Sequence, residues 1–185
     1  MNPRKRLYTL AAVLLLSVAA LPACATRQAN KLIDEGNAAV KEAEKFATDA
    51  DAKINEIAAG LAEFPENRDQ LKTPAQAALD NLDKGIAKLR EAASKFDEGS
   101  KTNLDAPLKE YLSLKSQEFA KHAEHLETLK GIPNAITDTS VTDREVLNTK
   151  FAEIKERVEK LEQEWTDLSQ RADKIQEANK DKFKS

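Results

Sequence analysis

Apolar residues recur at alternating steps of three and four along four long segments of the chain. That spacing places them on one face of an α-helix, so each segment is predicted to be an amphipathic helix with one buried stripe. The predicted stripes cover residues 32–64, 71–96, 108–129 and 147–178.

Prolines and capping residues indicate where these helices begin and end. Pro65 is expected to stop the first helix, and Thr73 followed by Pro74 to open the second as N-cap and first helical residue. Asp105 is expected to be the N-cap of the third helix, and residues 131–133 (Gly-Ile-Pro) to end it. Because proline inside a helix costs about 3 kcal/mol, its confinement to helix ends would support these boundaries.

The start of the fourth helix carries the clearest local signal. A loop is expected over residues 134–140. Thr142 and Glu145 have the spacing of a capping box, and Val141 and Val146 are placed for a hydrophobic staple.

Short connections between successive helices favour antiparallel neighbours. The sequence therefore predicts an all-α fold, namely an antiparallel up-down-up-down four-helix bundle with coiled-coil-like packing and long first and last helices. Residues 30–185 are expected to form this single bundle domain.

Composition narrows the class of protein. The 185 residues carry a formal charge of −3, and a third of them are charged. Removing the first 23 residues, which hold three basic and no acidic side chains, leaves 26 basic against 32 acidic groups. Both signs are interleaved along the chain. This distribution argues against a nucleic-acid partner, which would call for a concentrated basic patch.

The first 24 residues differ from the rest. A basic start over residues 1–6 precedes an apolar run at residues 7–21. As a helix, that run would span only about 22 Å, short of a hydrocarbon core of roughly 30 Å. A basic start, a short apolar run and a small residue before the break are typical of a secretory signal rather than a membrane span.

Residues 21–24 read Leu-Pro-Ala-Cys, which resembles the bacterial lipobox. The resemblance covers the first 24 residues only. It implies that residues 1–23 are a signal peptide cleaved after Ala23, with diacylglycerol in thioether linkage on Cys24 and an acyl chain on the new amino terminus. Residues 24–29 would then be the acylated cysteine and a short tether. The alternative is an ordinary cleaved signal followed by an incidental free cysteine.

Two acyl chains or more make such an anchor stable where one is marginal. Ala25 resembles the pattern of lipoproteins sorted to the outer membrane, facing the periplasm, in hosts with two membranes. Cys24 is also the chain's only cysteine, so a disulfide within the monomer is excluded. No cofactor is expected beyond the covalent lipid.

One cluster in the third segment has metal-ligating chemistry. Glu118, His122 and His125 could reach one side of a helix, yet zinc requires three or four converging ligands and the chain has no other histidine. The plain interpretation is a half-buried histidine bonded to a neighbour. Lys115 lies on the same stripe, either fixing helix register or marking a solvent-facing edge. Trp165 is expected in the core.

The sequence contains no nucleophile-elbow, zinc-protease, P-loop or dinucleotide-binding motif. We therefore expect a lipid-anchored envelope protein with a non-enzymatic binding, adaptor or spacing role, and no catalytic residues. Its expected partners are the membrane and either another protein or a second copy, through the heptad helices. The alternative is a ligand- or metal-binding lipoprotein that uses His122 and His125.

Overall fold

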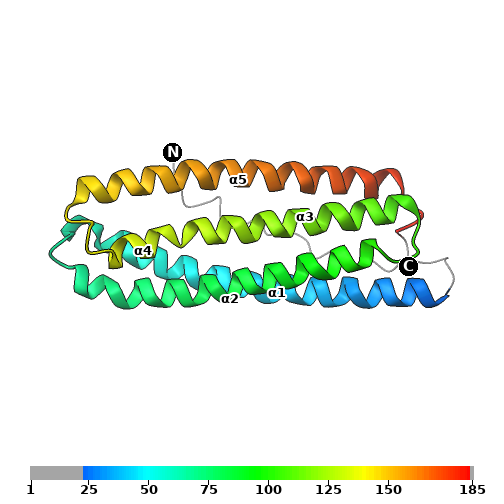
Figure 1. The fold of residues 1–185 in the computed structure, drawn as a ribbon, viewed down its shortest axis with the longest axis horizontal. Helices are drawn as coiled ribbons and strands as arrows, with labels where there is room; N and C mark the ends of the chain where they lie inside the picture. Colours follow the sequence, from blue (N-terminus) through cyan, green and yellow to red (C-terminus); the bar gives the residue numbers. More distant parts are fainter. Residues whose placement is uncertain (1–22, 184–185) are drawn as a thin grey trace.

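The computed structural model describes residues 23–183, and their side chains from Arg27 onward. Within this range no strand occurs, so the predicted all-helical fold is confirmed. The described residues form four long helices, a 3-10 turn and one short helix: α1 (Ala23–Gly60), η2 (Leu61–Glu63), α2 (Arg68–Ser100), α3 (Ala106–Leu129), α4 (Gly131–Thr137) and α5 (Arg144–Ala178). Figure 1 shows how short connections join the long helices.

The helix lengths agree with the prediction that the outer helices are the longer ones. α1 and α5 have 38 and 35 residues, against 33 in α2 and 24 in α3. The predicted signal peptide over residues 1–22 lies outside the described residues. Because α1 begins at Ala23, residues 24–29, which we expected to form a tether, belong to a helix.

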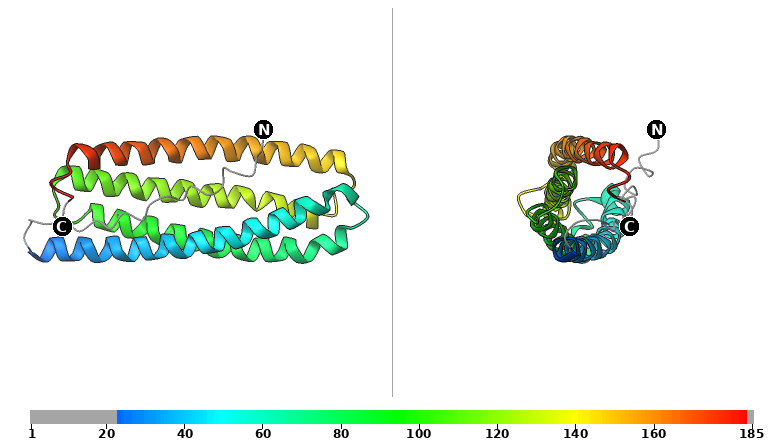
Figure 2. Two further views of the ribbon diagram at one scale, coloured as in Figure 1. Left: turned by 180° about the vertical axis from the view of Figure 1, so that it is seen from behind. Right: turned by 90° about the vertical axis from the view of Figure 1, so that its right-hand side faces the viewer.

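The four long helices pack in the order α1, α2, α3, α5. Each neighbouring pair is in contact over a long stretch, whereas α1 and α5 do not pack along one another. The end-on view in Figure 2 shows the result, an open arc with α1 and α5 at its two ends.

The main apolar core is shared by all four long helices and is rich in alanine on α1, where small side chains bring the helices close together. Phe96 of α2 stacks on Phe119 of α3 with ring centroids 5.3 Å apart. Gly36 of α1 lies directly against Phe96, because a Cβ there would come within 2.9 Å of the ring. The centre of this core contains Val40, Ala43, Leu82, Ile86, Leu89, Leu112, Leu126 and Ala172.

A second, smaller core forms around the α1–α2 connection. Ile57, Phe64 and Leu71 supply its first side, and Ile136 of α4 and Leu147 of α5 pack against them. α4 therefore joins the α1–α2 connection to the start of α5.

The start of α2 differs from the prediction. α2 begins at Arg68 rather than after Thr73, so Pro74 lies inside the helix, and the expectation that every proline marks a helix end is wrong here. The extra turn buries Leu71 and lets the Arg68 guanidinium donate a hydrogen bond to the Val141 carbonyl. We attribute the longer helix to these tertiary contacts, which offset the hydrogen bond that Pro74 cannot donate.

The limits of α3 were predicted more closely. Asp105 is its N-cap residue, although the carboxylate pairs with Lys182 at 3.4 Å and makes no capping bond. The helix ends at Leu129. The loop expected at 134–140 is wrong in its first half, because residues up to Thr137 form α4 and bury Ile136.

The cap of α5 is one residue away from the predicted position. Asp143 is the N-cap, and its Oδ1 accepts hydrogen bonds from the backbone N–H groups of Glu145 and Val146 at 2.9 and 3.0 Å. The predicted staple is also wrong. Val141 is buried, but Val146 is 38% exposed, and it is Leu147 that shares the small core with Val141.

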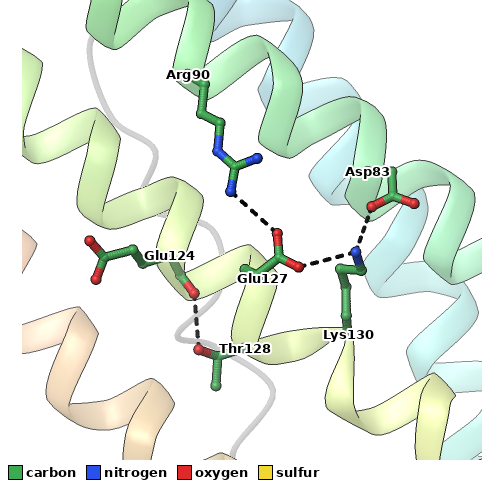
Figure 3. A network of polar contacts seen from close by, with 6 residues as sticks. All are labelled: Asp83, Arg90, Glu124, Glu127, Thr128 and Lys130. Carbon is green, nitrogen blue, oxygen red and sulfur yellow. Dashed lines mark hydrogen bonds and ion pairs between the residues drawn. The ribbon is translucent and has the colours of Figure 1, made fainter.

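Polar contacts on the outer surface tie α2 to α3 (Figure 3). Lys130 bridges Asp83 and Glu127 at 2.7 and 3.1 Å, and Arg90 reaches Glu127 at 3.5 Å. Exposed pairs of this kind contribute at most about 1 kcal/mol each. They therefore contribute less to holding α2 and α3 together than the apolar core beneath them.

We predict that Asp143→Ala destabilises the protein by about 1 kcal/mol, because two backbone N–H groups at the start of α5 lose their acceptor. Urea unfolding followed by circular dichroism measures this loss. Thr142→Ala is the control and should change the stability by less than about 0.5 kcal/mol. If Thr142→Ala lost more stability than Asp143→Ala, Thr142 would be the N-cap, as the capping box predicts.

Candidate functional site: a polar array between α3 and α5

Two of the three candidate ligands of α3, Glu118 and His122, face α5, and His125 lies close enough to His122 to affect its pKa. Glu118 and His122 are buried, with 5% and 7% of their surface exposed, and His125 is half-buried. The structure therefore places all three candidates in one region. It also shows that His122, whose burial the sequence left open, lies in the interior.

An ion pair neutralises the buried carboxylate. The Lys115 ammonium lies 2.7 Å from a Glu118 carboxylate oxygen and 4.9 Å from the centre of the Phe119 ring. Both charged groups are largely shielded from solvent. Lys115 is thus a largely buried, paired cation, which argues against one of its two predicted roles, that of marking a solvent-facing edge.

α5 and the neighbouring turn of α3 complete the array. Burial raises the pKa of Glu118, and the nearby Asp173 charge raises it further, while Lys115 and a hydrogen bond from Ser169 lower it. Burial, together with the charges of Glu118 and Asp173, also raises the pKa of Tyr111. Tyr111 therefore remains a neutral phenol at physiological pH.

His122 packs between two aromatic rings. Its imidazole meets Trp165 of α5 edge to face, with centroids 4.1 Å apart, and lies 6.2 Å from the Phe119 ring. The Trp165 Nε1 is buried and has no hydrogen-bond partner among the described residues. Trp165 is therefore a half-buried neighbour of His122 that belongs to neither apolar core, so its predicted core position is not confirmed.

Both histidines are held in the neutral form. Burial lowers the pKa of His122 to about 3, assisted by the His125 and Lys115 charges. Burial alone lowers the pKa of His125 to about 4. Two neutral imidazoles therefore lie beside a carboxylate that is paired with a lysine.

Among residues 27–183, whose side chains the structure describes, no three histidine, cysteine, aspartate or glutamate side chains converge to hold a metal ion. Glu118 is engaged by Lys115 and Ser169, and His122 faces Trp165. The geometry thus gives no support to the alternative of a metal site at Glu118, His122 and His125.

Two half-buried carboxylates on α1 were missed by the sequence reasoning. Burial raises the pKa of Asp51 to about 6, and no described residue gives it a hydrogen bond or an ion pair. Burial also raises the pKa of Glu44, partly offset by Lys41. Their spacing could have identified them, since Glu44 and Asp51 are seven residues apart and therefore lie on the same side of the helix, beside the apolar stripe.

No protein-family model, curated protein or solved structure matches this chain. Over the described residues, none of the helices combines the length and the apolar character needed to cross a bilayer. Any inference about function therefore depends on the chain's own residues.

We predict that His122→Phe reduces the loss of stability at acidic pH. Because the folded pKa lies below the usual 6.5, the unfolded chain binds a proton that the folded chain excludes, and stability falls as pH drops from about 6.5 towards 3. Between pH 7 and pH 5, the wild type should lose about 1–2 kcal/mol more than the variant. Urea unfolding at both pH values measures this difference, and equal losses would contradict a neutral buried imidazole.

We predict that Asp51→Asn stabilises the protein at pH 7. A raised folded pKa means that the ionised carboxylate opposes folding at neutral pH, and that the penalty disappears as pH falls from about 6 to below 3.8. With allowance for solvent screening, the gain should be about 1–2 kcal/mol at pH 7 and near zero at pH 3.5. Asp49→Asn, on the exposed face of α1, is the matched control.

Proposed function

We propose that this chain is a lipid-anchored envelope protein with a non-enzymatic binding, adaptor or spacing role. The observation that carries the proposal is the signal-like leader ending in Leu-Pro-Ala-Cys, with the chain's only cysteine at position 24. Cleavage after Ala23 would make the acylated Cys24 the first residue of the mature protein.

The start of α1 supports a close connection between anchor and bundle. Because α1 begins at Ala23, the lipid on Cys24 would attach to the helix itself rather than to a flexible tether. A helix of 38 residues extends about 57 Å. The proposed antiparallel up-down-up-down order of the helices would then carry the second core well away from the membrane surface.

The location and partners follow from the same features. Ala25 favours the outer membrane, facing the periplasm, if the host has two membranes. The partners are the membrane and a protein, or a second copy of the chain, contacting the long helices. The non-enzymatic assignment is supported by the polar array, whose Glu118, Lys115 and Ser169 are engaged with one another.

Mass spectrometry of the protein extracted from its host's membranes tests the anchor. We predict a mature chain that begins at Cys24 and carries a diacylglyceryl thioether with an acylated amino terminus. Cys24→Ser, which removes the sulfur, should give an unprocessed and unacylated chain. A free thiol on Cys24 in the wild-type protein would refute the proposal.

A further inference from the structure

The two ends of the helical arc have incompletely covered apolar faces. Among the residues that the structure describes, α1 makes its extensive contacts with α2 and α5 makes its extensive contacts with α3, although Ile57 of α1 and Leu147 of α5 share the second core. As a result, Ala47 and Ile54 of α1 and Val158 of α5 pack against the rim of the main core and stay half-buried. These faces of α1 and α5 are the uncovered edges of the arc.

The half-buried carboxylates of α1 belong to its uncovered edge. Glu42 pairs with Lys88 of α2 at 2.9 Å. Glu42 therefore marks the flank of α1 that lies next to α2. Glu44 and Asp51 lie about half a turn around the helix from that flank, at 100° per residue. They therefore border the side of α1 that no long helix covers.

The two flanks of α5 differ in the same way as those of α1. Glu164 pairs with Lys121 of α3 at 3.1 Å on one flank. Glu162 is two residues earlier, about half a turn away, and is half-buried. Asp173 lies on the same flank as Glu162 and acts on Glu118. Both edges thus combine apolar contact area with carboxylates, and the α5 edge also carries Lys155, which is seven residues before Glu162 and pairs with Glu159 at 3.9 Å.

We propose that these two edges bind a cationic amphipathic helix from a partner protein. Its apolar side chains would pack on Ala47, Ile54 and Val158, and its lysines or arginines would pair with Glu44 and Asp51. A helix laid in an elongated apolar site is a recurrent mode of peptide recognition. Residues 37–54 of α1 extend about 26 Å, which matches a helix of about 18 residues. The inference rests on the binding role proposed above.

The position of Asp51 supports a cationic partner. It is ionised at neutral pH at an energetic penalty, because burial raises its pKa and no cation of the described chain pairs with it. A lysine or arginine from a partner would remove that penalty on binding, so the carboxylate would favour the complex over the free bundle.

A second copy is a poorer occupant on charge grounds. The outward face of α5 carries exposed charged and polar side chains and no apolar stripe: Glu153, Glu156, Arg157, Lys160 and Gln163. The uncovered edge of α1 carries Glu44 and Asp51, so joining the α1 edges of two copies would bring like charges together, which is unfavourable.

Trp165 allows a direct test, because it is the chain's only tryptophan, is half-buried and lies seven residues after Val158 on the same face of α5. The chain, purified from membranes in neutral detergent, is titrated with a helical leucine–lysine peptide of about 18 residues that lacks tryptophan. We expect a saturable change in Trp165 emission. A scrambled peptide of the same composition and a leucine–glutamate peptide should give none.

The variants separate specific pairing from general attraction. Glu44→Gln combined with Asp51→Asn should weaken binding of the leucine–lysine peptide about fivefold, because two charge pairs are lost. The matched control is Asp34→Asn with Asp49→Asn, on the exposed face of α1. It removes the same charge and should leave the affinity within about twofold. Circular dichroism confirms that each variant is folded.

Three results would overturn the inference: equal binding of the scrambled peptide, equal weakening by the control variant, or no response of Trp165. A dimer in sedimentation equilibrium whose dissociation is needed before the peptide binds would assign the edges to a second copy instead. Acylation of Cys24 is read separately by mass spectrometry. A chain that is acylated but does not bind the peptide therefore refutes this inference without contradicting the proposed lipid anchor.

Discussion

Burial of one apolar stripe on each long helix is the constraint on which the rest of this structure depends. Two inner helices, α2 and α3, satisfy it with a long neighbour on each side. The outer helices have one such neighbour each, and their stripes stay partly open. The arc, rather than a closed bundle, therefore accounts for both the well-packed centre and the uncovered edges of α1 and α5.

Polar groups inside the bundle follow from the same arrangement. Glu118 is stable in the interior because Lys115 and Ser169 engage it, and the histidines are tolerated because they remain neutral. Removing one partner of such a pair would strand a buried charge. This requirement links the sequences of α3 and α5 and favours a single register between them, a use of buried polar groups known from coiled coils.

Periodicity was sufficient to predict the four long helices, since each apolar stripe repeats over many turns. The ends of these helices were harder to predict where tertiary contacts override the local preference of the sequence. Pro74 lies inside α2 because Leu71 and Arg68 gain contacts that a short sequence window does not reveal. At the start of α5, Thr142 and Asp143 are both residues that commonly cap helices. The helix is capped by Asp143, one residue later than predicted, and it is correspondingly Leu147 rather than Val146 that is buried.

The candidate site shows a similar limit. Periodicity placed Glu118 and His122 on the inner stripe of α3, but their partners Ser169 and Trp165 depend on how α5 docks. Asp51 is the more instructive case, because a charged residue beside a stripe is usually solvated in a closed bundle. Here Asp51 is half-buried and has no ion-pair partner among the described residues. The partner helix proposed above would supply the cation that Asp51 lacks in the free bundle and would remove the cost of its burial.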